Sequence, residues 1–213
     1  GGGFIGFSSD RLTDEQRKQG GQSIEVARVA LVFVVAEKMA PVDALTTQQV
    51  IDIYSRKTRE WRPGLPIRLV RRPLAESDNF ILMENIPQLR PLITALLDPN
   101  SEAGRGLPLA NDAQENASYI EQYEQHPGAF GTSSTNMLIT EKRALKPLKL
   151  DGREPSAANI LNGSYPLQKP VLLITGKVVT PEMRSFITFV ETSKASRDIF
   201  TQDRKSTRLN SSH

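Results

Sequence analysis

The stretch IEVARVALVFVVA, from Ile24 to Ala36, decides the fold class of this chain. Its uninterrupted apolar run from Val29 to Ala36 is too short to cross a bilayer, which takes about 20 apolar residues, and it predicts a long buried strand. A second apolar strand is predicted in KPVLLITGKVV, from Lys169 to Val179. These two strands, one near each end, bracket a middle section with strands and helices of its own. The arrangement predicts two lobes joined by paired crossing strands, with a ligand-binding cleft between them.

Helix and strand signals take turns along the chain, which indicates an α/β protein. Thr46 is followed three residues later by Gln49, a capping-box pattern that starts a helix. LPIRLVRR, residues 65–72, is a predicted strand. From Ser77 a helix is expected to run until Pro87 cuts it short.

Composition limits the possible functions. The chain has 213 residues, 38% apolar and 24% charged, as is usual for a globular protein. It has no cysteine, which excludes disulfides, thiolate metal sites and a thiol nucleophile. The formal charge of +3 is small and the basic residues are scattered, so nucleic acid is not an expected partner. No cofactor is expected either.

Both ends of the sequence are unusual. GGGFIGFSSD begins without Met in what looks like the middle of a strand, so we expect that upstream residues of the protein are missing. DRKSTRLNSSH, residues 203–213, has no apolar period. It is interpreted either as non-native sequence or as a disordered tail.

RRPLAESDNF, from Arg71 to Phe80, places two guanidinium groups just ahead of a predicted helix start. An oxyanion taken out of water needs donors that replace its hydration. An Arg fork supplies charge-assisted hydrogen bonds, and a helix N-terminus adds free N–H groups and a positive dipole end. We therefore predict an anion site made of the Arg72 guanidinium, the Ser77 hydroxyl and the backbone at Asp78 and Asn79. Arg71 is expected to alternate to the other face and to be solvated.

Six segments, taken in order, resemble the phosphate-binding proteins of bacterial ABC importers, which have the type 2 periplasmic-binding-protein fold. They are GFSSDRLTDEQ (6–16), PVDALTTQQVIDIYSRKTREW (41–61), IRLVRR with ESDN (67–79), HPGAFGTSS (126–134), LKLDGREPSAANILNGSYPLQKPVLLIT (148–175) and MRSFITFVETSKASRDIF (183–200). The resemblance implies two α/β lobes with crossing hinge strands, the first lobe being incomplete. Residues 1–40 and 165–203 would form a remnant of the N-terminal lobe with the hinge strands, 41–164 the second lobe, and 204–213 the tail.

The resemblance also assigns further site residues and shows where this chain departs from the family. Family members have Arg, three residues, then Ser-Gly-Thr, whereas here the spacing is one longer and Asp78-Asn79 replace Gly-Thr. Asp78 is interpreted either as a helix cap or as the acceptor of a ligand proton, which would favour hydrogen phosphate over sulfate. Ser8 and Ser9 match a Ser-Asp pair of the family, although an ordinary polar turn is an equal reading.

Apart from the resemblance, Thr132 follows the predicted strand GAFG and could place a hydroxyl in the cleft, although hydroxyls at a strand end are common without a ligand. His126 precedes Pro-Gly at the end of a predicted helix and is interpreted as a cap of that helix and not as a catalyst.

Three functions remain possible. The leading hypothesis is a receptor, not an enzyme, that captures an inorganic oxyanion, most simply phosphate, and presents it to an ABC transporter permease. Such a receptor would be a monomer in the periplasm or another extracytoplasmic space, with lipid anchoring left open. The alternatives are a phosphatase-like enzyme on the same fold and a ligand-free structural or signalling domain. Replacing Arg72 by Ala is expected to abolish anion binding and to leave the melting curve nearly unchanged.

Overall fold

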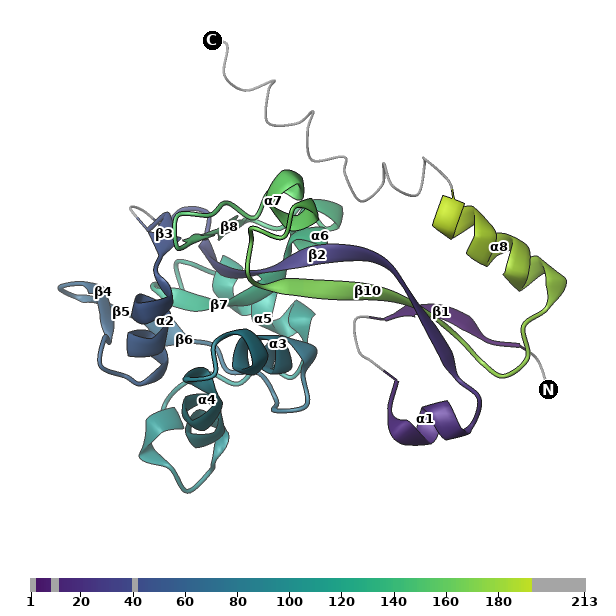
Figure 1. Ribbon diagram of the computed structural model, residues 1–213. Coiled ribbons are helices and arrows are strands. Elements are labelled where there is room, and N and C mark those ends of the chain that lie inside the picture. Colours follow the sequence, from purple (N-terminus) through teal and green to yellow (C-terminus); the bar gives the residue numbers. More distant parts are fainter. Residues whose placement is uncertain (1–2, 9–11, 40–41, 193–213) are drawn as a thin grey trace, which may run out of the picture. The chain divides into compact units, whose positions relative to one another are not determined.

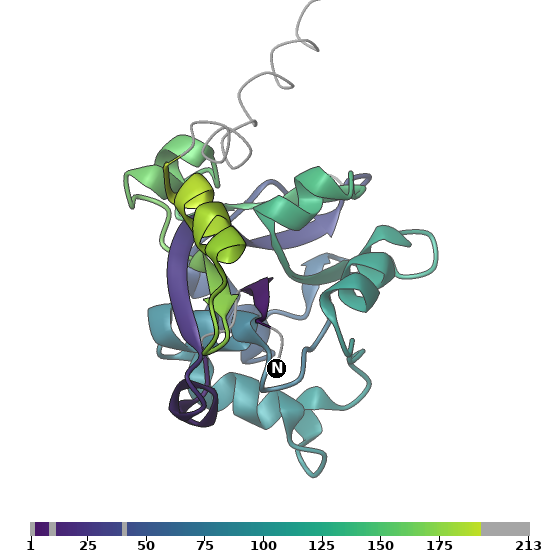
Figure 2. The same ribbon diagram turned by 90° about the vertical axis from the view of Figure 1, so that its right-hand side faces the viewer.

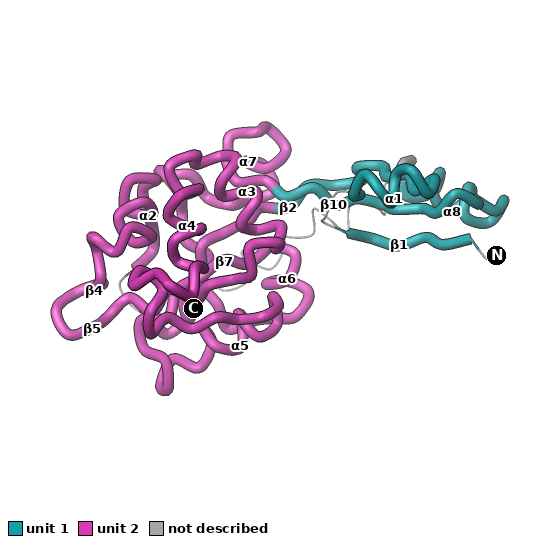
Figure 3. Tube along the Cα trace, turned by 90° about the horizontal axis from the view of Figure 1, so that it is seen from below, with its two compact units in different colours: residues 1–29, 169–213 teal, residues 30–168 magenta. Residues whose placement is uncertain are grey.

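The computed structural model describes residues 3–8, 12–39 and 42–192 of the chain (Figure 1). The chain divides into two compact units, shown in Figure 3. Unit 1 is built from the segments 1–29 and 169–213, and unit 2 is the continuous segment 30–168. The assignment of these units to the lobes of the predicted domain division stays a prediction. No helix in the described ranges is long and apolar enough to span a membrane.

Unit 2 is organised around the second half of strand β2 (Gln22–Ala36). β2 pairs antiparallel with β7 (Ala129–Ser134) and with β8 (Leu145–Pro147), and β7 pairs in parallel with β6 (Arg68–Leu69). Smaller pairs join β3 (Ala44–Leu45) to β9 (Lys149–Leu150) and β4 (Glu60–Arg62) to β5 (Leu65–Pro66). The strands of unit 2 therefore bring β6 and β7 side by side, and both lead to the predicted site.

Helices surround these strands. They are α2 (Thr47–Tyr54), α3 (Ser77–Asn85), α4 (Leu89–Leu97), the 3-10 turn η1 (Glu102–Gly104), α5 (Ala113–Glu121), α6 (Thr135–Thr140) and α7 (Ala157–Leu161). α5 packs along β7, while α4 packs against both α2 and α3 (Figures 1 and 2). Every residue of β2 from Ala30 to Ala36 is buried, which explains why this strand has no polar alternation. Its Phe33 ring stacks on Phe130 of β7, 5.5 Å between ring centres.

Unit 1 contains β1 (Ile5–Ser8), which pairs antiparallel with β10 (Gln168–Thr175). β10 in turn neighbours β2 in the sheet order. Two helices complete the described part of this unit, α1 (Asp14–Lys18) and α8 (Pro181–Thr192). Phe7 of β1 contacts Phe186 of α8 edge to face, yet both rings stay well exposed.

Several local predictions are confirmed. Thr46 and Gln49 form the predicted capping box at the start of α2, with the Thr46 hydroxyl accepting from the Gln49 N–H. The helix expected from Ser77 begins there and ends at Asn85, before Pro87. The polar spacing of a cap depends only on neighbouring residues, so sequence suffices to place such helix starts.

Two local predictions are wrong. LPIRLVRR is not one strand, because β5 pairs with β4 whereas β6 pairs with β7, so the chain changes partners at Ile67. His126 was expected to cap the helix before it, but α5 already ends at Glu121 and the His126 ring stacks on Tyr119 at 3.7 Å. In the first case pairing with a strand distant in sequence outweighed the local pattern, and in the second the helix ends earlier than the sequence predicted.

Candidate functional site

Arg72 lies shortly after β6, and its side chain is 4% exposed. Its Nη2 donates to Oε2 of Glu76 at 2.5 Å, and its Nη1 lies 3.9 Å from Oδ2 of Asp78. Its Nε is buried and has no hydrogen-bond partner in the part of the chain that the structure describes. A buried, unpaired N–H beside a charge is costly, so it marks this guanidinium as a place where a further acceptor would be stabilised.

Asp78 does not cap α3, so the capping interpretation is wrong. The N-cap residue is Glu76, which makes no side-chain cap hydrogen bond, and Asp78 is the second residue inside the helix. Its buried carboxylate accepts a hydrogen bond from the Thr132 hydroxyl of β7 at 2.9 Å. Burial raises the pKa of the nearby Tyr54 hydroxyl, and the Asp78 charge raises it further, so Tyr54 stays a neutral donor.

Asn79 and Ser77 complete the turn at the start of α3. The Asn79 amide donates to the carbonyl oxygens of Arg72 and Pro73, at 3.0 and 2.8 Å, and so holds the loop between β6 and α3 closed. Ser77 is half-buried, and its hydroxyl has no partner within the described ranges. Asn79 therefore shapes the loop with its side chain, while Ser77 keeps a hydroxyl available.

The structure thus connects Arg72, Asp78, Asn79 and Thr132 through direct contacts, while the Ser77 side chain makes no hydrogen bond with them in the described part of the chain. A cavity of about 20 Å³ lies beside this cluster. Its lining includes Tyr54, Arg71, Arg72, Asn79 and Thr132. That volume is enough for about one water molecule. In this conformation the guanidinium contacts the Glu76 carboxylate and lies near that of Asp78, and a larger ligand needs side chains to move.

Sequence reasoning missed two residues of this network. Glu76 stands four residues after Arg72, a spacing at which oppositely charged side chains commonly pair, and that signal was available. Asn116 of α5 donates to the Thr132 carbonyl oxygen at 2.7 Å and is 1% exposed. Nothing local in the sequence connects Asn116 to Thr132, because only the packing of α5 on β7 brings them together.

Arg71 corrects another expectation, since it is not solvated. Its Nη1 donates to the carbonyl oxygen of Leu96 and its Nη2 to that of Leu107, both at 2.7 Å. Leu96 belongs to the last turn of α4, where carbonyl groups lack helical partners. Arg71 is therefore a structural residue that ties α4 and the following loop to β6.

Replacing Arg71 by Ala is expected to lower the free energy of unfolding by about 2–4 kcal/mol, because two charge-assisted hydrogen bonds to backbone carbonyls are lost. Urea denaturation of the variant would measure this. Arg90→Ala, which removes an exposed arginine from α4, is the control and should change stability by less than about 0.5 kcal/mol. Equal effects of the two substitutions would show that the Arg71 contacts contribute nothing.

Ser8 and Ser9 were the predicted contribution of the first lobe. Ser8 ends β1 in unit 1, where it lies opposite Leu172 of β10. Ser9 lies outside the described residues. Their participation in the anion site stays a prediction.

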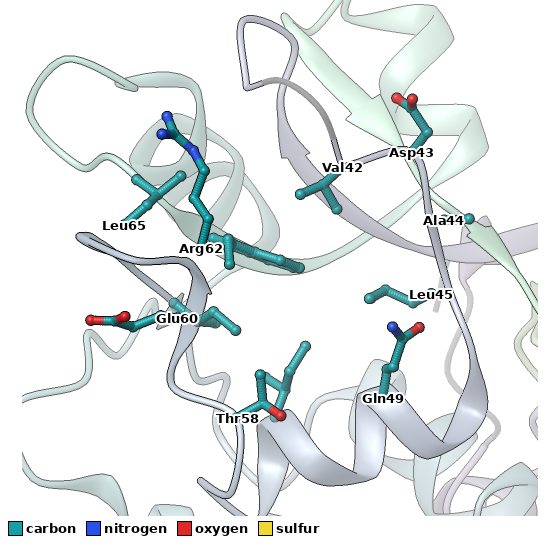
Figure 4. Close-up of a pocket in the computed structure, with 12 residues that line it drawn as sticks. Val42, Asp43, Ala44, Leu45, Gln49, Thr58, Glu60, Arg62 and Leu65 are labelled. Carbon is teal, nitrogen blue, oxygen red and sulfur yellow. The ribbon is translucent and has the colours of Figure 1, made fainter.

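A larger hollow of about 480 Å³ lies elsewhere in unit 2, between α2 and the β4–β5 hairpin. Val42, Leu45 and Gln49 point into it, whereas the carboxylates of Asp43 and Glu60 point away (Figure 4). The Gln49 amide oxygen is already used in the capping box. The interior of the hollow between α2 and the β4–β5 hairpin is largely apolar. This hollow therefore lacks the converging donors that an oxyanion needs.

Comparison with known proteins supplies independent information. Residues 4–194 match a family described as a PBP superfamily domain. No curated protein sequence matches the chain. Among solved structures, a phosphate ABC transporter substrate-binding protein from Clostridium perfringens with bound phosphate is 25% identical, with a TM-score of 0.70. That match covers 92% of this chain and 75% of the other.

Two further structures agree in fold. An ABC-type phosphate transport receptor from Vibrio cholerae is 19% identical with a TM-score of 0.57, over 92% of this chain and 76% of that receptor. A human phosphate-binding apolipoprotein is 15% identical with a TM-score of 0.67, over 91% of this chain and 73% of the apolipoprotein.

Proposed function

This chain belongs to the PBP superfamily, and from that premise we propose that it captures an inorganic oxyanion, phosphate in the first place, for delivery to an ABC transporter permease. The observation that carries the proposal is the buried Arg72 guanidinium in the loop between β6 and α3, whose Nε has no acceptor among the residues that the structure describes. The similarity to a phosphate-bound transport protein over 92% of the chain supports the same ligand.

The chemistry of the site supports an oxyanion of this kind. Arg72 offers a charge-assisted fork, Tyr54 and Thr132 line the same cavity with their hydroxyl-bearing side chains, and Ser77 begins the helix that follows. Asp78 places a carboxylate beside the site, which repels sulfate but can accept the proton that hydrogen phosphate carries. We therefore propose Arg72, Ser77, Asp78, Asn79 and Thr132 as the contribution of unit 2, with Ser8 and Ser9 as the contribution of unit 1.

The remaining features of the proposal follow from the family. A receptor that serves an importer works outside the cytoplasmic membrane, and capture by closure of two hinged lobes requires no catalysis. The phosphatase-like alternative is not favoured, because the similar structures described above are named as binding or transport proteins.

Calorimetric titration of the chain with phosphate tests the proposal. Binding with a Kd of about 1 μM or tighter is expected, together with much weaker binding of sulfate. A chromogenic phosphomonoester should not be turned over. Absence of phosphate binding up to millimolar concentrations would favour a ligand-free domain, and turnover would favour the enzyme.

A further inference from the structure

We propose that Glu76 is an internal competitor of the ligand for Arg72, and that it sets the affinity and the selectivity of the site. This inference rests on the proposed function, because it concerns the same guanidinium. No resemblance assigns a role to Glu76, and the side-chain geometry is what connects it to the anion site.

The first support is the position of the Glu76 carboxylate. It accepts from Arg72 Nη2 at 2.5 Å, while the neighbouring Nε of the same guanidinium has no partner in the described part of the chain. A tetrahedral oxyanion that binds an Arg fork accepts from two N–H groups at once. Nη2 carries two N–H groups, so a ligand that engages Nε together with Nη2 would place its negative oxygen atoms on the same nitrogen that Glu76 already contacts, and the two anions compete for the same cation.

The second support is the difference in exposure between the two partners. The Glu76 side chain is 32% exposed, whereas that of Arg72 is 4% exposed and that of Asp78 is 8% exposed. Asp78 is also held by the Thr132 hydroxyl. Glu76 is therefore the acidic group of this cluster that can turn into solvent without leaving a buried charge unpaired once the ligand is bound.

The third support is charge. The Arg72 guanidinium faces two carboxylates, those of Glu76 and Asp78, so an incoming anion meets two negative groups around this cation. Tyr54 also faces it but stays neutral, because burial and the Asp78 charge raise its pKa. An anion that enters while Glu76 remains on Arg72 would meet two like charges in a confined site. Displacement of Glu76 relieves this repulsion, and only a ligand that binds Arg72 strongly can drive it.

The alternative explanation is that Glu76 merely stabilises α3. It occupies the N-cap position, but its side chain makes no capping hydrogen bond. Its carboxylate contacts Arg72 instead. Removing the negative charge therefore need not weaken the start of the helix.

The test is Glu76→Gln, measured by calorimetry with inorganic phosphate and with sulfate. The amide oxygen of Gln can still accept from Nη2, so the fold is kept, while the competing charge is gone. Phosphate affinity is expected to rise about tenfold, the factor that corresponds to losing one charge-assisted hydrogen bond to the competitor. Sulfate affinity should rise at least as much, because a repulsive carboxylate has been removed.

Glu102→Gln is the matched control, since it removes the same charge from a side chain that is 82% exposed and paired with Arg105. It should leave both affinities unchanged. Glu76→Asp is a second variant that keeps the charge but shortens the side chain by one methylene, and it should also raise phosphate affinity. Melting curves of all variants establish that they are folded.

The outcomes separate this inference from the proposed function. If the unaltered chain binds phosphate and folded Glu76 variants bind equally or more weakly, the inference is overturned and the function stands. If only the Glu76 variants bind, the inference stands and the unaltered chain is not a phosphate receptor by itself. If none binds phosphate up to millimolar concentrations, both are overturned.

Discussion

Replacing Arg72 by Ala is expected to abolish phosphate binding and to lower the free energy of unfolding by about 3–5 kcal/mol. The loss of binding follows from removal of the fork that would hold the anion. The loss of stability follows from burial, because the Asp78 carboxylate, 8% exposed, and the Glu76 carboxylate would both lose the Arg72 guanidinium. Calorimetry with phosphate and urea denaturation measure the two effects separately.

Arg72→Lys distinguishes these effects. Lys keeps a positive charge near Asp78, so much of the stability should remain, but a single ammonium group cannot reproduce a two-donor fork. We expect a phosphate affinity reduced about 100-fold in a folded protein. A folded Lys variant with undiminished affinity would place the anion site elsewhere. The sequence alone predicted an Arg72→Ala variant of nearly unchanged stability, and the burial of Arg72 revises that expectation.

Replacing Gly128 by Ala is expected to destabilise unit 2 by about 4 kcal/mol, a large part of the stability of an ordinary domain. Gly128 has φ +79°, and an added Cβ would lie 2.0 Å from the carbonyl oxygen of Pro66. Gly128 lies close to Pro66 because two hydrogen bonds hold its carbonyl oxygen. This oxygen accepts from the Arg68 N–H of β6 and from Trp61 Nε1 of β4. Urea denaturation measures the change.

Gly64→Ala is the matched control for this prediction. Gly64 has almost the same φ, +81°, but nothing lies within 4 Å of its added Cβ. Gly64→Ala should therefore lower the free energy of unfolding by about 1–2 kcal/mol, the effect of a left-handed backbone conformation alone. If both variants lose the same stability, the close approach of Gly128 to Pro66 has no energetic consequence.

The fold class was readable from the sequence because it depends on patterns that local physics determines. The apolar runs of β2 and β10, the Thr46 cap of α2 and the alternation of elements predicted an α/β protein. The resemblance of six segments to phosphate-binding proteins implied the type 2 periplasmic-binding-protein fold, and the family match and the solved structures confirm it. The strand predicted over residues 65–72 failed, because pairing partners, which differ for β5 and β6, are not encoded in a short stretch.

The sequence by itself determined which groups are available near the start of α3: a guanidinium at Arg72, a hydroxyl at Ser77 and acidic and amide side chains after it. The tertiary structure alone decided how they are used. In the folded chain Arg71 donates to a backbone carbonyl of α4, and the Asp78 carboxylate accepts from Thr132 of β7. The Glu76 carboxylate accepts from Arg72. The reason is that a buried charge must find its partner wherever packing provides one, and packing joins residues that lie far apart in the chain.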